Sequence, residues 1–163
     1  MADFPTRPAP DLDTEHATYL GFDYGEKRTG VAVGQRITGT ASGLETLRSH
    51  NREVFWQSVA RLVKTWQPAA FVVGVPYPIQ ATTEKNPVID RILQFCRELE
   101  NRHARPVYVM DEALSTRESQ TLFYSQRTRK SVQFADIKDE LAARLILQSW
   151  LDHTAPAPER LNG

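Results

Sequence analysis

The chain has 163 residues, which suits one domain whose hydrophobic core needs neither disulfides nor a metal for stability. Its 20 Lys and Arg residues balance its 20 Asp and Glu residues, so bulk charge predicts neither binding nor exclusion of nucleic acid, and an anionic partner requires a local basic patch. The single cysteine excludes an internal disulfide framework and a cysteine-based zinc site.

The predicted elements begin after a tail. Residues 1–17 are rich in proline and acids without a hydrophobic period, so we expect a disordered tail there, one folded domain over 18–153 and a flexible tail over 154–163. Three short apolar stretches, TYLGFDYG, TGVAVG and RITGTASGLETL, predict three successive antiparallel strands. Helical spacing of apolar residues then predicts a helix from Asn51, its expected N-cap, to Trp66.

The second half alternates strands and helices. AAFVVGV predicts a buried strand and PYPIQATTEKNP a proline-rich loop, followed by a helix over Val88–Arg102 with Cys96 in the core. PVYVMD predicts the fifth strand, and Ser115 with Glu118 forms a capping box for another helix. QRTRKSVQF predicts an exposed basic loop before a last helix over Asp136–Leu151. This order predicts an α/β fold, with a mixed five-stranded sheet, three antiparallel strands first, and helices on both faces.

Acidic residues occupy corresponding places in these elements. Asp23 ends the first strand, and Asp111 with Glu112 ends the fifth. In the last helix, Asp139 shares its face with apolar residues such as Ile146, so we expect it to point toward the sheet. Alternation along the fifth strand puts Asp111 and Glu112 on opposite faces, and we expect the longer Glu112 to face the site.

Carboxylates without Cys or His neighbours suit hard cations, and a cation would offset their mutual repulsion. Carboxylates around two such ions form the arrangement that cleaves phosphodiesters. Each acid also has an ordinary structural explanation: a turn cap for Asp23, an N-terminal helix acid for Glu112 and a solvated charge for Asp139. Spacing alone leaves both interpretations open.

Four segments resemble the motif blocks of the bacterial YqgF/RuvX family: GFDYGEKRTGVAVGQRITGTA, VVGVP, DEALST and KDELAARLILQSWL. The resemblance runs from about Tyr19 to His153 and implies the RNase H-like fold of the RuvC resolvases. Family members are described as Holliday junction resolvases or pre-16S rRNA processing nucleases. The resemblance therefore implies a metal-dependent nuclease that uses Mg²⁺ or Mn²⁺ on pre-rRNA or branched DNA. The catalytic candidates are Asp23, Asp111, Glu112 and Asp139, with Asp23, Glu112 and Asp139 as the expected metal ligands.

Basic residues supply candidate contacts to nucleic acid. They are Lys27, Arg28 and Arg36 in the first block, and Arg127, Arg129 and Lys130 in the basic loop. Solvated turns and loops explain the same residues without a function. The chain departs from the family pattern at Ala113, where the family usually has Arg, and in the loops over residues 76–87 and 124–134. Those loops are expected to affect substrate preference more than fold.

Competing functions remain at this stage. A sugar kinase or actin-like ATPase is disfavoured because the chain has length for one lobe, and Val31 and Ala32 replace the Lys and Ser or Thr of a phosphate-binding loop. A non-catalytic RNA-binding factor of ribosome assembly stays open. Because its net charge is neutral, the chain offers no broad basic face for a four-way junction, so we rank pre-rRNA ahead as the substrate. A monomer and a homodimer are both open. We expect a cytoplasmic protein without membrane association, because no secretory leader or apolar span is evident.

Overall fold

The computed structural model describes residues 16–76, 86–112 and 131–154, with side chains from 138 onward in the last range. Its elements are β1 (Thr18–Asp23), β2 (Arg28–Gln35), β3 (Thr40–Arg48), α1 (Arg52–Trp66), β4 (Ala70–Val75), α2 (Pro87–His103), β5 (Val107–Asp111) and α4 (Ser131–Thr154). The expected tails fall almost entirely outside these ranges, as do the capping box at Ser115 and the loop residues 77–85. No helix in the described part is both long and apolar enough to cross a membrane.

The sheet has the strand order β3-β2-β1-β4-β5. β1, β2 and β3 pair antiparallel, whereas β4 pairs parallel with both β1 and β5. The predicted mixed five-stranded sheet, with its three antiparallel strands first, is therefore confirmed. Because β1, β4 and β5 run in one direction, their carboxyl ends, including Asp23 and Asp111, reach the same edge.

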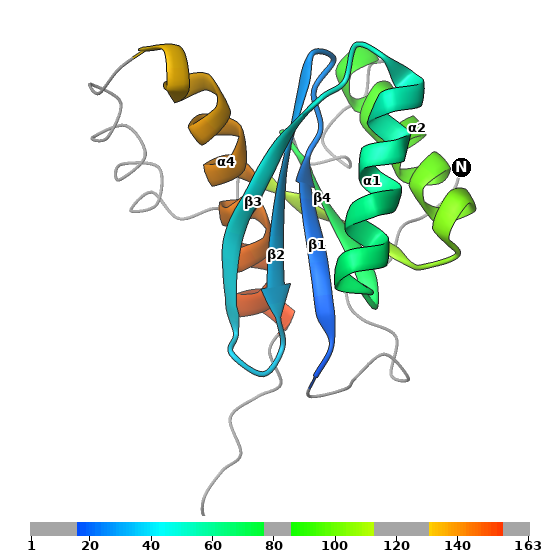
Figure 1. The fold of residues 1–163 in the computed structure, drawn as a ribbon. Helices are drawn as coiled ribbons and strands as arrows, with labels where there is room; N and C mark the ends of the chain where they lie inside the picture. Colours follow the sequence, from blue (N-terminus) through cyan, green and yellow to red (C-terminus); the bar gives the residue numbers. More distant parts are fainter. Residues whose placement is uncertain (1–15, 77–85, 113–130, 155–163) are drawn as a thin grey trace, which may run out of the picture.

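Helices cover both faces of the sheet (Figure 1). α1 and α2 lie side by side on one face, where Phe55 and Phe95 join the larger core cluster. α4 covers the other face, and its Trp150 packs against Tyr19 and Tyr108 with ring centroids 4.8 and 5.5 Å apart. The two cores hold the sheet between its helices. α4 packs directly on β1 and β5, the strands that end at Asp23 and Asp111.

Helix boundaries follow the expected caps, with one correction. The Asn51 side chain accepts a hydrogen bond from the Val54 backbone N–H at 3.1 Å, as the N-cap prediction required. Cys96 is fully buried, as expected. The predicted basic loop was too long, because α4 already begins at Ser131 instead of Asp136. The added residues include Gln133 and Ala135, and Gln and Ala are good helix formers, so weak apolar periodicity there does not stop the helix.

Candidate active site

Asp23 is the last residue of β1 and lies opposite Gly30 of β2. Alternation along β1 places it on the α4 side, because Tyr19 joins the core under α4 and Gly21 lies against Leu147. Burial raises the pKa of the Asp23 carboxyl from 3.8 to about 7, and the charges of Glu112 and Asp139 add to the rise while Lys138 opposes it. A nearby cation would stabilise the ionised form of this carboxyl.

Glu112 follows β5 directly and points to the same side of the sheet. A Cβ placed on Gly74 of β4 would lie 3.3 Å from the Glu112 Oε1 atom and against Ile146 of α4, so the Glu112 carboxylate is on the α4 face. Burial raises its pKa, and the neighbouring Asp111 raises it further. Asp111 has the strand parity of Val107 and Val109, which pack into the opposite core. This geometry supports Glu112 over Asp111 as the acid beside Asp23.

Asp139 reaches the same edge from α4. The Arg28 Nε atom donates a hydrogen bond to the Asp139 Oδ2 atom at 2.8 Å, joining the first residue of β2 to the helix. The Asp139 backbone also presses on β2, because a Cβ on Gly30 would lie only 1.9 Å from the Asp139 carbonyl oxygen. Sequence reasoning expected an inward-facing Asp139, but it gave no sign that Arg28 would be its partner.

The turn between β1 and β2 is held by buried hydroxyls. The fully buried Thr29 shares a hydrogen bond of 2.8 Å with Ser49, and the Ser49 backbone N–H donates to the Lys27 carbonyl at 2.9 Å. A Cβ on Gly25 would lie 2.5 Å from the Arg28 carbonyl oxygen, so the turn requires glycine there. The turn that presents Lys27 and Arg28 is thus fixed on both sides.

The donor set suits a divalent cation. Asp23, Glu112 and Asp139 offer only oxygen ligands, and the first two have raised pKa values that a cation would counteract. As the side chains stand, no group of three His, Cys, Asp or Glu residues within the described ranges could hold a metal ion. The Arg28 hydrogen bond engages the Asp139 Oδ2 atom.

A model of the family "RuvX: Holliday junction resolvase" matches residues 17–153. The chain belongs to the RuvX family. A protein of Methylococcus capsulatus named "Putative pre-16S rRNA nuclease" is 49% identical to this RuvX chain over 146 residues, covering 90% of this chain and 95% of its own. A protein of Ralstonia nicotianae with the same name is 38% identical over 150 residues, covering 92% and 96%.

Two solved structures share the fold of this RuvX chain. RuvC of T. thermophilus, in complex with a Holliday junction substrate, aligns with a TM-score of 0.50 and 16% identity over 85% of this chain and 96% of its own. A fowlpox virus resolvase in complex with Holliday junction DNA aligns with a TM-score of 0.52 and 14% identity, over 83% and 97%. The expected RNase H-like fold is confirmed by these neighbours.

The structure separates the basic candidates of this RuvX protein into groups. Lys27 is exposed in the turn that follows Asp23, and Arg28 is half-buried against Asp139. The sequence analysis missed Lys138, an exposed residue close enough to lower the pKa of Asp23; its position next to Asp139 was the available signal. The remaining loop candidates, Arg127, Arg129 and Lys130, lie outside the described residues.

Arg36 requires a correction, because it lies at the opposite end of the β1–β2 pair from Asp23. Its guanidinium carbon is 5.3 Å from the Tyr19 ring centroid and 5.4 Å from that of Trp150. Its NH2 nitrogen also donates to the Thr154 hydroxyl at 3.1 Å. Arg36 thus binds the end of α4 to the sheet, and we remove it from the nucleic-acid candidates.

Replacing Arg36 with Ala tests this assignment. We expect the free energy of unfolding to fall by roughly 1 to 3 kcal/mol, because the substitution removes cation–π and hydrogen-bond contacts. Affinity for nucleic acid should stay unchanged. Lys27→Ala is the matched control and should show the reverse pattern. Urea denaturation and fluorescence anisotropy measure the two quantities, and a selective loss of affinity in Arg36→Ala would return Arg36 to the binding site.

Gly30→Ala should damage both stability and the site. The added methyl group would overlap the Asp139 backbone, which cannot move without shifting α4, so we expect a loss of roughly 3 kcal/mol or more in the free energy of unfolding. Gly43→Ala is the control on β3, where the new Cβ would meet the Glu140 Cβ at 3.2 Å. Its loss should be markedly smaller in the same urea titration; equal losses would contradict the special closeness at Gly30.

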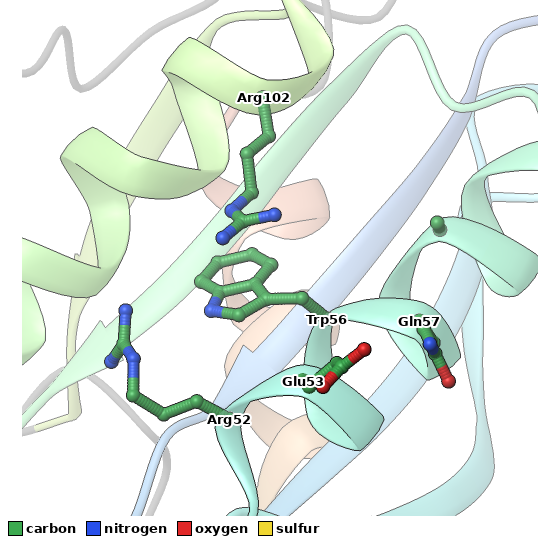
Figure 2. A pocket seen from close by; sticks show the side chains of 6 residues that line it. Arg52, Glu53, Trp56, Gln57 and Arg102 are labelled. Carbon is green, nitrogen blue, oxygen red and sulfur yellow. The ribbon is translucent and has the colours of Figure 1, made fainter.

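A groove between α1 and α2 lies on the face of the sheet opposite α4. Figure 2 shows the Arg102 guanidinium over the Trp56 indole, and its central carbon is 4.5 Å from the ring centroid. Glu98 accepts hydrogen bonds from Arg52 at 2.6 Å and from Arg102 at 2.9 Å. Because these cations already share a carboxylate and lie on the face away from Asp23, we do not assign the groove to nucleic acid.

Proposed function

We propose that this RuvX protein is an endonuclease that hydrolyses phosphodiester bonds with a bound Mg²⁺ or Mn²⁺, and that its substrate is the 5′ end of pre-16S rRNA in the cytoplasm. The observation that carries the proposal is the convergence of Asp23, Glu112 and Asp139 at one sheet edge. Burial and mutual repulsion leave the Asp23 carboxyl with a pKa of about 7, a state that a structural turn cap does not explain.

Each residue of this edge has a proposed role. Asp23, Glu112 and Asp139 would hold the cation, which when bound supplies Lewis-acid activation of water and stabilisation of the leaving oxygen. The exposed Lys27 and Lys138 would hold phosphate oxygens of the strand to be cut. Lys27 lies in the turn after Asp23, and Lys138 is close enough to lower the Asp23 pKa.

Two substrate classes have support. The relatives that cover nearly the whole chain carry the pre-16S rRNA nuclease name, which favours pre-rRNA. The description of the family as Holliday junction resolvases favours a four-way junction as the second candidate. Symmetric cutting of a junction requires two sites related by two-fold symmetry, hence a homodimer, whereas trimming of one RNA strand needs a single site.

Side-by-side cleavage assays distinguish these candidates. A labelled pre-16S 5′ leader and a labelled four-way junction are incubated with the protein in Mg²⁺, in Mn²⁺ and in EDTA, and light scattering gives the mass in solution. We expect cleavage of the leader that EDTA abolishes. Preferential cutting of the junction by a dimer would favour the second candidate. Metal-dependent cleavage of neither, with RNA binding retained, would replace the nuclease by a non-catalytic RNA-binding factor.

A further inference from the structure

The contact between Arg28 and Asp139 joins two residues with different proposed partners. Arg28, the first residue of β2, is a candidate contact to nucleic acid, and Asp139 is an expected ligand of the cation. Their hydrogen bond of 2.8 Å is a charge-assisted pair, with the Arg28 side chain 36% exposed and that of Asp139 only 15% exposed. The guanidinium is therefore open to an approaching ligand, while the carboxylate is not.

In this arrangement the positive charge of Arg28 offsets the negative charge of the Asp139 carboxylate and not that of Asp23. No three acids of the described part could hold a metal ion as they stand. Arg28 holds one of the two carboxylate oxygens of Asp139, the Oδ2 atom, in this arrangement.

We propose that Arg28 is a positioning residue that holds Asp139 in the free protein and releases it when a phosphate of bound nucleic acid takes the guanidinium, so that nucleic acid and divalent cation bind cooperatively. This inference rests on the proposed nuclease function and adds a regulation of the same site. A guanidinium carries five N–H donors in a planar fork that fits a phosphate as well as a carboxylate, so the exchange keeps Arg28 paired. The Asp139 Oδ2 atom then becomes available at the moment when substrate is present.

Thermodynamic linkage between the two binding events predicts how large the effect on each affinity should be. If nucleic acid raises the affinity for the cation by some factor, the cation raises the affinity for nucleic acid by the same factor, and such factors are typically about 5-fold to 150-fold. A protein without the Arg28 contact should lose this coupling, because its Asp139 is already free. Its affinity for the cation without nucleic acid should therefore exceed that of the wild type.

Mn²⁺ binding measured by electron paramagnetic resonance and by calorimetry tests the proposal without relying on turnover. Wild type, Arg28→Gln, Arg28→Lys and Lys27→Gln are titrated with Mn²⁺, with and without a phosphorothioate RNA of the 5′ leader. For the wild type we expect the RNA to tighten Mn²⁺ binding at least about 5-fold. Arg28→Gln should bind Mn²⁺ tightly in both conditions, and Arg28→Lys should retain part of the coupling.

Lys27→Gln removes a neighbouring cation and controls for long-range charge. An equal gain of Mn²⁺ affinity in Lys27→Gln and Arg28→Gln would overturn the specific role of Arg28. Wild-type Mn²⁺ affinity that ignores the RNA, in a protein that cleaves its substrate, would overturn the coupling and leave the nuclease intact. A wild type that neither binds Mn²⁺ nor cleaves would overturn the nuclease itself, and the coupling with it. Near-ultraviolet circular dichroism checks that each variant is folded.

Discussion

Replacing Asp23 with Asn is expected to slow phosphodiester cleavage by about 1000-fold or more, which equals about 4 kcal/mol of lost transition-state stabilisation. The amide keeps the shape of the side chain but loses the negative charge that would help to hold the cation. Asp23 is the most strongly perturbed of the candidate acids, because it is buried at the end of β1 with Glu112 and Asp139 nearby. Single-turnover cleavage of the labelled leader measures the rate.

The matched control for this variant is Asp90→Asn, the same chemical change at an exposed acid in the first turn of α2. Asp90→Asn should cleave at the wild-type rate. If Asp23→Asn kept its activity while remaining folded, Asp23 would return to the role of a turn cap. If both variants lost activity together, the loss would reflect a general charge effect and not the site.

The second large effect concerns stability and pH. Because the folded state raises the Asp23 pKa to about 7 from 3.8, the folded protein holds this proton more tightly than the unfolded chain. The contribution to stability is full below pH 3.8 and is lost as the pH rises through about 7. For the metal-free protein we expect a loss of roughly 3 kcal/mol from Asp23 between about pH 5 and pH 8.

The comparison with Asp23→Asn isolates this contribution. Glu112 acts in the same direction, because burial and Asp111 raise its pKa. His103 acts in the opposite direction, because burial together with Arg105 and Arg102 lowers its pKa, so the wild-type curve alone mixes these contributions. Urea unfolding in EDTA should show the variant gaining stability relative to wild type as the pH rises. Added Mg²⁺ should remove much of that difference, since it favours the ionised carboxyl. A difference that does not change with pH would contradict the burial of Asp23.

Much of the fold could be predicted from local pattern. Short apolar stretches between glycines gave the first three strands, and Asn51 marked the start of α1 because an N-cap works through atoms three residues away. The start of α4 could not be predicted in this way. The stretch after Ser131 lacks a clear apolar period, and its helical state depends on propensity and on the packing of the following turns.

The candidate site was only partly predictable. Strand alternation correctly separated Asp111 from Glu112, because period two is a local property of the backbone. The pairing of Arg28 with Asp139 joins residues 111 positions apart, so it follows from how α4 lies on the sheet and from no nearby pattern. The contacts of Arg36 could not be predicted for a related reason: its Tyr19 and Trp150 partners come from two distant elements.

The placement of α4 has a consequence for synthesis of the protein. β1, with Asp23, leaves the ribosome first, whereas α4 brings Asp139 only after the five strands have been made. Until α4 emerges, Trp150 cannot pack against Tyr19 on this face of the sheet. A nascent chain therefore carries Asp23 without Asp139, and the three acids come together only when translation of the domain is nearly finished.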